Sequence, residues 1–180
     1  MSFSISMNSQ DMVDFIDKWG INAQEAVRPA AQAAAEVIYE SVKANVGQIK
    51  SVTGNLARSI YQVYSKTNSV ENHTATYHIS WNHITAPHGW MIENGHIQRY
   101  KNYQDELGRI RPMVRPGMKE KRQKPRRGAS QATKDAYYVR LPKDIEVSGK
   151  FFLRRAADRF PAAAGAAKTV LVAYMMGHKE

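Results

Sequence analysis

Residues 22–46 have the sequence NAQEAVRPAAQAAAEVIYESVKANV, the longest helical pattern in the chain. Small and branched apolar residues recur there at intervals of three and four, as the buried face of a helix requires. The expected buried positions are Val27, Ala30, Ala31, Ala34, Val37, Ile38, Val42 and Val46. Pro29 should kink or restart this helix, because proline lacks a backbone donor and crowds the preceding turn. Gly47 is its expected end.

A shorter helix is expected before this one. Asp11, Asp14 and Asp17 suit the positive end of a helix dipole, and an apolar stripe accompanies them as far as Trp19. Gly20 is predicted to break the pattern.

The middle of the chain has the two-residue period of β-strands. Residues 58–66 alternate, with Ile60 and Tyr64 on one side, and residues 74–81 alternate more regularly. Turn-forming residues separate the two stretches, so we expect a β-hairpin.

A third strand is expected at residues 136–141, followed by a C-terminal helix over 149–174. Pro161 makes either two helices or one bent helix there. These elements predict an α+β fold, in which a small, mostly antiparallel sheet packs against the N-terminal and C-terminal helices. We expect a single domain over 1–180, divided into 10–46 (helical), 56–97 (hairpin and turn), 98–135 (a basic insertion arm between strands) and 136–175 (strand and helix).

Composition narrows the class of protein. The chain has 180 residues, of which 43% are hydrophobic, and that is enough for a real core. It has no cysteine, which excludes disulfides, thiol catalysis and thiolate metal sites. No run of 18 apolar residues is present, and the first residues lack the blocks of a secretory signal. We therefore expect a protein made and kept in the cytosol, or in a particle assembled there.

Most of the positive charge lies in one segment. Residues 98–135 hold twelve Lys and Arg against four Asp and Glu, a balance of +8 in a chain whose total is +10. This basic arm (residues 98–135) also holds three of the seven prolines. Clustered positive charge suggests a partner rich in phosphate or carboxylate, and a solvated loop is the alternative.

Signals of catalysis or metal binding are weak. Five of the six histidines fall between His73 and His96, but the spacing of five in the first four sends successive side chains to opposite faces of a strand. GxSxG, GxxxxGK[ST] and GxGxxG motifs are all missing from the sequence. Glu93 beside His96 has no third orienting group, so we expect Glu93 to anchor a turn at Asn94–Gly95 or to bond a neighbouring chain. We expect no enzyme, no metal site and no cofactor.

Three phrases, in this order, resemble a known family: TGNLARSI at residues 53–60, WMIENGH at 90–96 and KFFLRRAA at 150–157. Together they are similar to the head–tail joining or tail-completion (neck) proteins of long-tailed bacteriophages, including proteins like minor tail protein Z. The similarity spans residues 10–175. This chain departs from the family in its Asn-Gly-His turn and in a longer basic insertion.

The resemblance implies a structural virion protein of the tail or neck, assembled in the host cytoplasm. It implies a homo-oligomeric ring of six subunits around the DNA channel. Head-connector and tail-tube or tail-terminator proteins would be its neighbours, and it would make non-specific contact with DNA. Assembly or DNA contacts are expected from Arg109, Arg111, Arg115, Lys119, Lys121, Arg122, Lys124, Arg126 and Arg127. Structural turn roles are expected for Thr53, Gly54, Leu56, Glu93 and Gly95, with Gly54 and Gly95 in left-handed conformations.

The alternative is a monomeric or dimeric nucleic-acid-binding module that uses the same cations. Tyr100 and Tyr103 lie among them and could stack on bases. A Pro- and Gly-rich loop presents no ordered helix to a groove, so any DNA contact would lack sequence readout.

Overall fold

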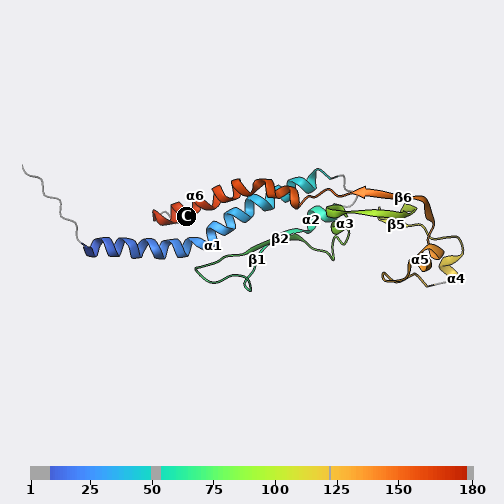
Figure 1. The fold of residues 1–180 in the computed structure, drawn as a ribbon, viewed down its shortest axis with the longest axis horizontal. Helices are drawn as coiled ribbons and strands as arrows, with labels where there is room; N and C mark the ends of the chain where they lie inside the picture. Colours follow the sequence, from blue (N-terminus) through green and yellow to red (C-terminus); the bar gives the residue numbers. More distant parts are fainter. Residues whose placement is uncertain (1–8, 50–53, 122, 178–180) are drawn as a thin grey trace, which may run out of the picture. The chain divides into compact units, whose positions relative to one another are not determined.

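The structure is a computed structural model that describes residues 9–49, 54–121 and 123–177. It is an α+β protein with a long N-terminal helix, a C-terminal helix and small antiparallel sheets, as the sequence predicts (Figure 1). Its described residues form two compact units, and the single domain expected from the sequence stays a prediction. Unit 1 comprises 9–48, 60–82 and 152–177; unit 2 comprises 49, 54–59, 83–121 and 123–151.

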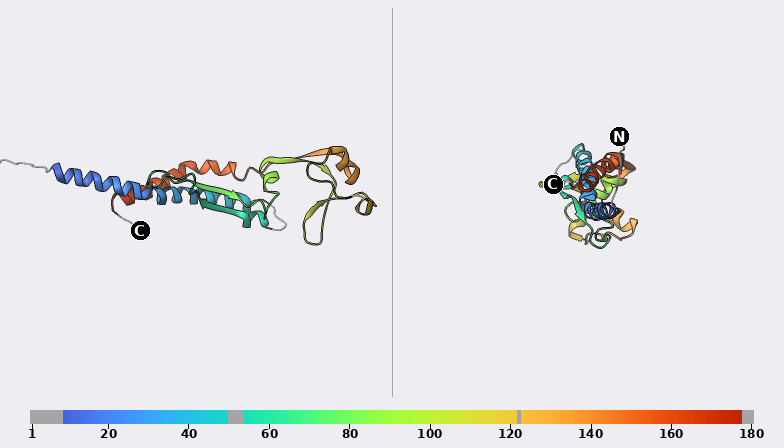
Figure 2. Two further views of the ribbon diagram at one scale, coloured as in Figure 1. Left: turned by 90° about the horizontal axis from the view of Figure 1, so that it is seen from below. Right: turned by 90° about the vertical axis from the view of Figure 1, so that its left-hand side faces the viewer.

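Two helices lie side by side in unit 1. Helix α1 runs from Ser9 to Gly47, and α6 runs from Phe160 to Met175 after a 3-10 segment, η1, from Arg154 to Arg159. Both views of the ribbon show α6 along α1, with the first turns of α1 extending beyond the end of α6 (Figures 1 and 2). Of the two alternatives left open at Pro161, the chain adopts two helical segments.

The helix break predicted at Gly20 was wrong. Helix α1 is continuous from Ser9 to Gly47, through both Gly20 and Pro29. Glycine costs a helix only about 1 kcal/mol relative to alanine, so one glycine in a helix of this length does not end it. Pro29 does not restart the helix either, and Figure 1 shows α1 bending along its length. The predicted end at Gly47 is confirmed.

The core of unit 1 uses smaller residues than the sequence pattern suggests. Ala26 and Ala35 are buried although they were not expected on the inner face, whereas Val37 and Ile38 are only half-buried. The buried positions on α1 are Asn22, Ala26, Ala30, Ala35, Val42, Asn45 and Val46. Alanine and asparagine at the inner face allow close approach of the neighbouring helix.

Phe152 and Val42 are the largest fully buried side chains. The Phe152 ring meets the ring of Trp81 edge-on, with 5.6 Å between centroids. Asn45 donates from Nδ2 to the Phe152 carbonyl oxygen at 3.0 Å. These contacts join α1, the hairpin and the start of the C-terminal helical segment in one core.

The predicted hairpin is confirmed. Strands β1 (Ile60–Tyr64) and β2 (Tyr77–Trp81) are antiparallel, with Ile60 opposite Trp81 and Tyr64 opposite Tyr77. The first strand begins two residues later than predicted, because Asn55–Ser59 forms a short helix, α2, that belongs to unit 2.

Unit 2 contains two further antiparallel pairs. Strand β3 pairs with β6 and β4 pairs with β5, and the register between β3 and β6 shifts between the pairs Gln98–Ile145 and Tyr100–Arg140. Short helices accompany them. The bounds are α3 Gly89–Asn94, β3 Gly95–Tyr100, β4 Asn102–Gln104, β5 Ile110–Pro112, α4 Met118–Lys121, α5 Gln131–Tyr137 and β6 Arg140–Ser148.

The third predicted strand was wrong in its position. Residues 131–137 form helix α5, and the strand, β6, runs from Arg140 to Ser148. Ser130 caps the helix by accepting from the Thr133 backbone N–H at 3.2 Å, and this cap outweighs the β-propensity of the tyrosines that follow. The basic arm is therefore more ordered than a loop.

None of the helices in the described residues is long and apolar enough to cross a membrane.

Candidate assembly and DNA-contact surface

Two glycines lie at the base of the basic arm: Gly95 begins β3, and Gly149 directly follows the end of β6. Gly95 has φ of +78°, and a Cβ there would lie 2.5 Å from the Val147 carbonyl oxygen. A Cβ at Gly149 would lie 2.5 Å from the Glu93 carbonyl oxygen. Only glycine fits such close backbone approach, and the positive φ at Gly95 agrees with the special backbone conformation expected there.

The backbone on either side of this crossing is also tied together. Lys150 donates its N–H to the Ile92 carbonyl at 2.7 Å, and Phe151 donates to the Glu93 carbonyl at 3.2 Å. The Glu93 side chain is 5% exposed. The phrase WMIENGH thus forms α3 and the entry to β3, and its backbone anchors the return strand.

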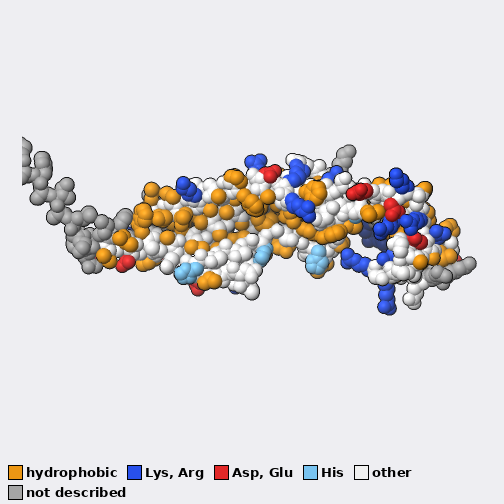
Figure 3. All heavy atoms as spheres, viewed as in Figure 1, with side chains coloured by type: hydrophobic (Ala, Val, Ile, Leu, Met, Phe, Trp, Pro, Cys, Tyr) orange, Lys and Arg blue, Asp and Glu red, His pale blue; other side chains and the backbone are white. Residues whose placement is uncertain are grey.

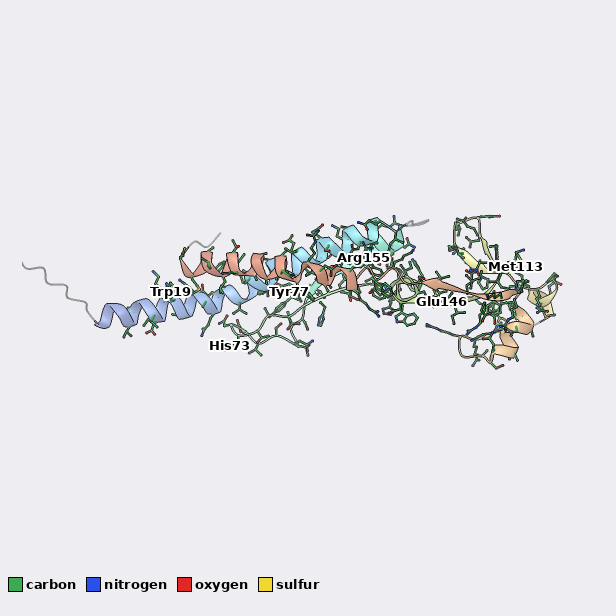
Figure 4. The ribbon with its side chains drawn as sticks, turned by 45° about the horizontal axis from the view of Figure 1, so that its top comes forward. Trp19, His73, Tyr77, Met113, Glu146 and Arg155 are labelled. Carbon is green, nitrogen blue, oxygen red and sulfur yellow. The ribbon has the colours of Figure 1, made fainter. Side chains whose placement is uncertain are left out.

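A ring of three backbone hydrogen bonds holds the middle of the basic arm. Lys101 donates to Val139 at 2.9 Å, Val139 to Met113 at 2.9 Å, and Met113 to Lys101 at 2.7 Å. These bonds join the entry to the β4–β5 hairpin, its exit and the end of α5. Met113 is labelled in Figure 4.

Asp105 organises the β4–β5 hairpin. It accepts from Arg109 Nε at 2.9 Å and from Arg111 Nε at 2.8 Å, and its side chain is only 16% exposed. Its Oδ1 also accepts the backbone N–H groups of Leu107 and Arg109. Desolvation acts to raise the pKa of Asp105, but the hydrogen bonds from Arg111 and Arg109 outweigh it and lower the pKa to about 2.

A second acid, Asp135, fastens α5 to the β3–β6 ribbon. Its carboxylate accepts from Tyr100 OH at 2.8 Å, from Gln131 Nε2 at 2.6 Å and from Arg140 Nη1 at 2.7 Å. The bond from Tyr100 holds the pKa of Asp135 below its usual range, against the raising effect of burial. Burial raises the pKa of Tyr100, and the bond to Asp135 raises it further.

The ribbon itself carries a third acid, Asp144. It receives Arg99 Nε and Arg140 Nη2, each at 3.3 Å. Arg99 at the start of the basic arm is thus matched by an acid on the return strand β6.

The nine predicted contact residues differ in how far their charge is already neutralised within the chain. Arg109 and Arg111 are paired with Asp105, so their charge mainly holds the hairpin together. Arg115 donates from Nε to the Tyr138 carbonyl at 3.1 Å, which leaves its charge without an acid. Four more of the nine, Lys119, Lys124, Arg126 and Arg127, are exposed and make no ion pair within the described part of the chain. Lys121 ends helix α4, and Arg122 lies outside the described residues.

Of the two tyrosines proposed to stack on bases, Tyr100 is already engaged. Its ring packs against Tyr138 with 5.3 Å between centroids, in addition to the bond to Asp135. Tyr103 is 38% exposed. The ring of Tyr138 lies edge-on to that of Tyr137, and both are buried.

The first phrase of the family resemblance leads from α2 into β1. Gly54 has φ of +68°, which confirms the left-handed conformation expected there, and Leu56 and Ile60 are buried. Thr53 lies outside the described residues.

The described histidines do not form a metal centre. No group of three His, Asp or Glu side chains in 9–49, 54–121 and 123–177 could hold a metal ion. His78 Nε2 lies 3.3 Å from Asn68 Nδ2 in the hairpin turn, and His96 lies on β3.

Sequence reasoning missed the residues that order the basic arm: Gln131, Asp135, Asp144 and Gly149. Asp105 had a signal, because an acid four residues before an arginine in a turn is a local pair. The other four also act on residues far away in the sequence: Gln131 and Asp135 bind Tyr100, Asp144 binds Arg99, and Gly149 lies against the Glu93 backbone, and no sequence pattern marks these contacts.

On the face shown in Figure 3, several Lys and Arg side chains gather over unit 2, while hydrophobic side chains cover much of α1 and α6.

Comparison of the chain with protein-family models, with curated proteins and with solved structures found no match.

Proposed function

We propose that this chain is a structural component of a tailed bacteriophage, a tail-completion or head–tail joining protein. It assembles as a homo-oligomeric ring of six subunits around the DNA channel. In this role it acts mechanically, binding a head-connector ring on one side and a tail-tube or tail-terminator protein on the other.

One observation carries the assembly part of the proposal: large apolar side chains of α1 and of the α6 region are left exposed. Val13, Ile16 and Ile21 on α1 are 48%, 59% and 57% exposed. Phe160 and Met176, at the two ends of α6, are 62% and 68% exposed. Several exposed large apolar side chains are typical of a protein–protein interface, and a ring of copies would cover them.

The virion part of the proposal rests on the three phrases of the family resemblance and on what they do in the fold. Each lies where one element passes into another: α2 to β1, α3 to β3, and the approach to η1. Phe152 of the third phrase is the centre of the core of unit 1. The resemblance therefore involves residues that organise the fold and not only its surface.

Mass spectrometry of purified phage particles is the deciding experiment. The chain is expected in intact particles and in isolated tails, at about six copies per particle, and electron microscopy should place it at the neck. A chain that is missing from assembled particles contradicts the proposal. Light scattering of the purified chain adds its oligomeric state in solution.

A second candidate function is a nucleic-acid-binding module, favoured by the four unpaired cations Lys119, Lys124, Arg126 and Arg127. They are exposed and close in sequence, so they can follow a phosphate backbone. On this alternative, affinity for DNA of random sequence falls steeply as salt is added, because phosphate contacts release counterions. Affinity that changes little with salt contradicts it.

A further inference from the structure

The first turns of α1 form an extension that the rest of unit 1 does not cover. Every side chain described between Val13 and Ile21 is exposed, and the next buried residue is Asn22. We name residues 13–21 the helical projection; Trp19, labelled in Figure 4, lies on it. Isolated helices shorter than about 12–15 residues are marginal in water, so this extension gains from a partner.

The helical projection presents apolar and acidic side chains on one face. Val13, Asp17 and Ile21 follow one another at intervals of four, which places them in one row along the helix. Asp14 lies beside this row, three residues before Asp17. The surrounding residues 11–25 hold four acids and one lysine, a net charge of −3.

The basic arm has the opposite character. Residues 115–127 hold seven Lys and Arg and one Glu, a net charge of +6. The β4–β5 hairpin of the same arm exposes Leu107 and Ile110 at 68% and 66%. Each surface therefore combines exposed apolar side chains with charge, and the charges are of opposite sign.

We propose that the helical projection of one copy docks on the basic arm of a second copy of this chain. The two surfaces are different parts of the molecule, so the contact is head-to-tail, and such contacts close into a ring when the rotation between copies allows it. This inference rests on the ring proposed above and specifies the contact that builds it. It also identifies a protein partner for the basic arm, because the helical projection of another copy supplies the acidic and apolar side chains that complement the arm.

Charge reversal in two separate variants tests the contact. The projection variant carries Asp14→Lys and Asp17→Lys, which change the charge of residues 11–25 from −3 to +1. The arm variant carries Lys119→Glu, Lys124→Glu, Arg126→Glu and Arg127→Glu, which change residues 115–127 from +6 to −2. Self-association is measured by analytical ultracentrifugation up to millimolar concentration, and circular dichroism checks that each variant is folded.

Each variant alone brings like charges together, so its self-association should be at least about tenfold weaker than that of the wild type. An equimolar mixture of the two variants should assemble again, because each projection then meets an arm of opposite charge. A single chain that carries all six substitutions should also assemble. Matched controls are Glu71→Lys and Lys66→Glu in the β1–β2 turn, where both side chains are exposed, and these should assemble like the wild type.

The apolar part of the contact has its own matched pair. Ile16→Ser should weaken self-association, whereas Val70→Ser should not, although both side chains are 59% exposed. The inference is overturned if the charge variants assemble like the wild type, or if the mixture of the two variants stays dissociated. In either case the proposed ring would have to form through another interface. A wild-type chain that stays monomeric at millimolar concentration also overturns it, while the virion assignment is decided separately by the composition of phage particles.

Discussion

Replacing Phe152 by alanine should unfold unit 1 at a much lower denaturant concentration. The side chain is 0% exposed, packs edge-on against Trp81 and lies where Asn45 bonds the backbone. Truncating a buried phenylalanine costs about 3–5 kcal/mol through lost burial and the cavity left behind. With a urea m value of about 2 kcal/mol per M, this loss lowers the midpoint by about 2 M.

The measurement is urea unfolding followed by tryptophan fluorescence, to which Trp81 contributes directly. Phe160→Ala is the matched control, because Phe160 lies eight residues further along the same chain segment and is 62% exposed. Surface substitutions usually change stability by less than about 0.5 kcal/mol. Equal shifts for the two variants would refute the assignment of Phe152 as the centre of the core.

Three further predictions concern the basic arm. Gly149→Ala should separate β6 from the end of α3, because the new Cβ would lie 2.5 Å from the Glu93 carbonyl oxygen. Gly128→Ala is the control and should be tolerated, since a Cβ there has no atom within 4 Å. Hydrogen exchange of the β3–β6 amides measures the difference between the two variants. The pKa of Asp105 is about 2, below the value of about 3.9 for an unfolded chain, so its contribution to stability is complete above pH 4 and is lost as the pH falls through about 2. NMR titration of the carboxyl carbon checks this, and an ordinary pKa there would contradict the ion pairs. Asp135→Asn should lower the pKa of Tyr100, because the hydrogen bond to a charged acceptor is lost while the burial of the ring stays. NMR titration of ring-labelled tyrosine measures this pKa. An unchanged pKa of Tyr100 would show that the bond to Asp135 does not form in solution.

The hairpin and the long helix could be predicted because their signals are local. Alternation over residues 74–81 determines which side chains share a face, and pairing of the two strands follows from the turn between them. The inner face of α1 was less predictable, since Ala26 and Ala35 are buried by their small size and position and not by hydrophobicity. Gly20 and Pro29 misled the prediction, because the packing of a long helix outweighs the local cost of one residue.

The end of the basic arm shows where local reasoning fails. Ala136–Leu141 has the composition of a strand, yet Ser130 caps a helix that takes in Tyr137, and the strand that follows contains Pro142. Proline is tolerated there because the pairing of β6 with β3 is interrupted between Ile145 and Arg140. Neither the cap nor the register shift is visible as periodicity in the sequence.

The net charge of the candidate surface could be predicted from the sequence, but which of its cations are free of ion pairs within the chain could not. Counting residues assigns +8 to the basic arm, but Asp105 binds Arg109 and Arg111, and so these two cations serve the hairpin. Asp135 lies 35 residues from Tyr100 in the sequence, so only the folded chain reveals that this acid fixes α5. What is left for a partner is concentrated in residues 115–127. A surface that binds DNA or an acidic helix needs cations that are not already neutralised, because a nearby carboxylate cancels most of the attraction that a guanidinium has for a second anion. Any partner of the arm is therefore expected to meet residues 115–127 and to leave the β4–β5 ion pairs intact.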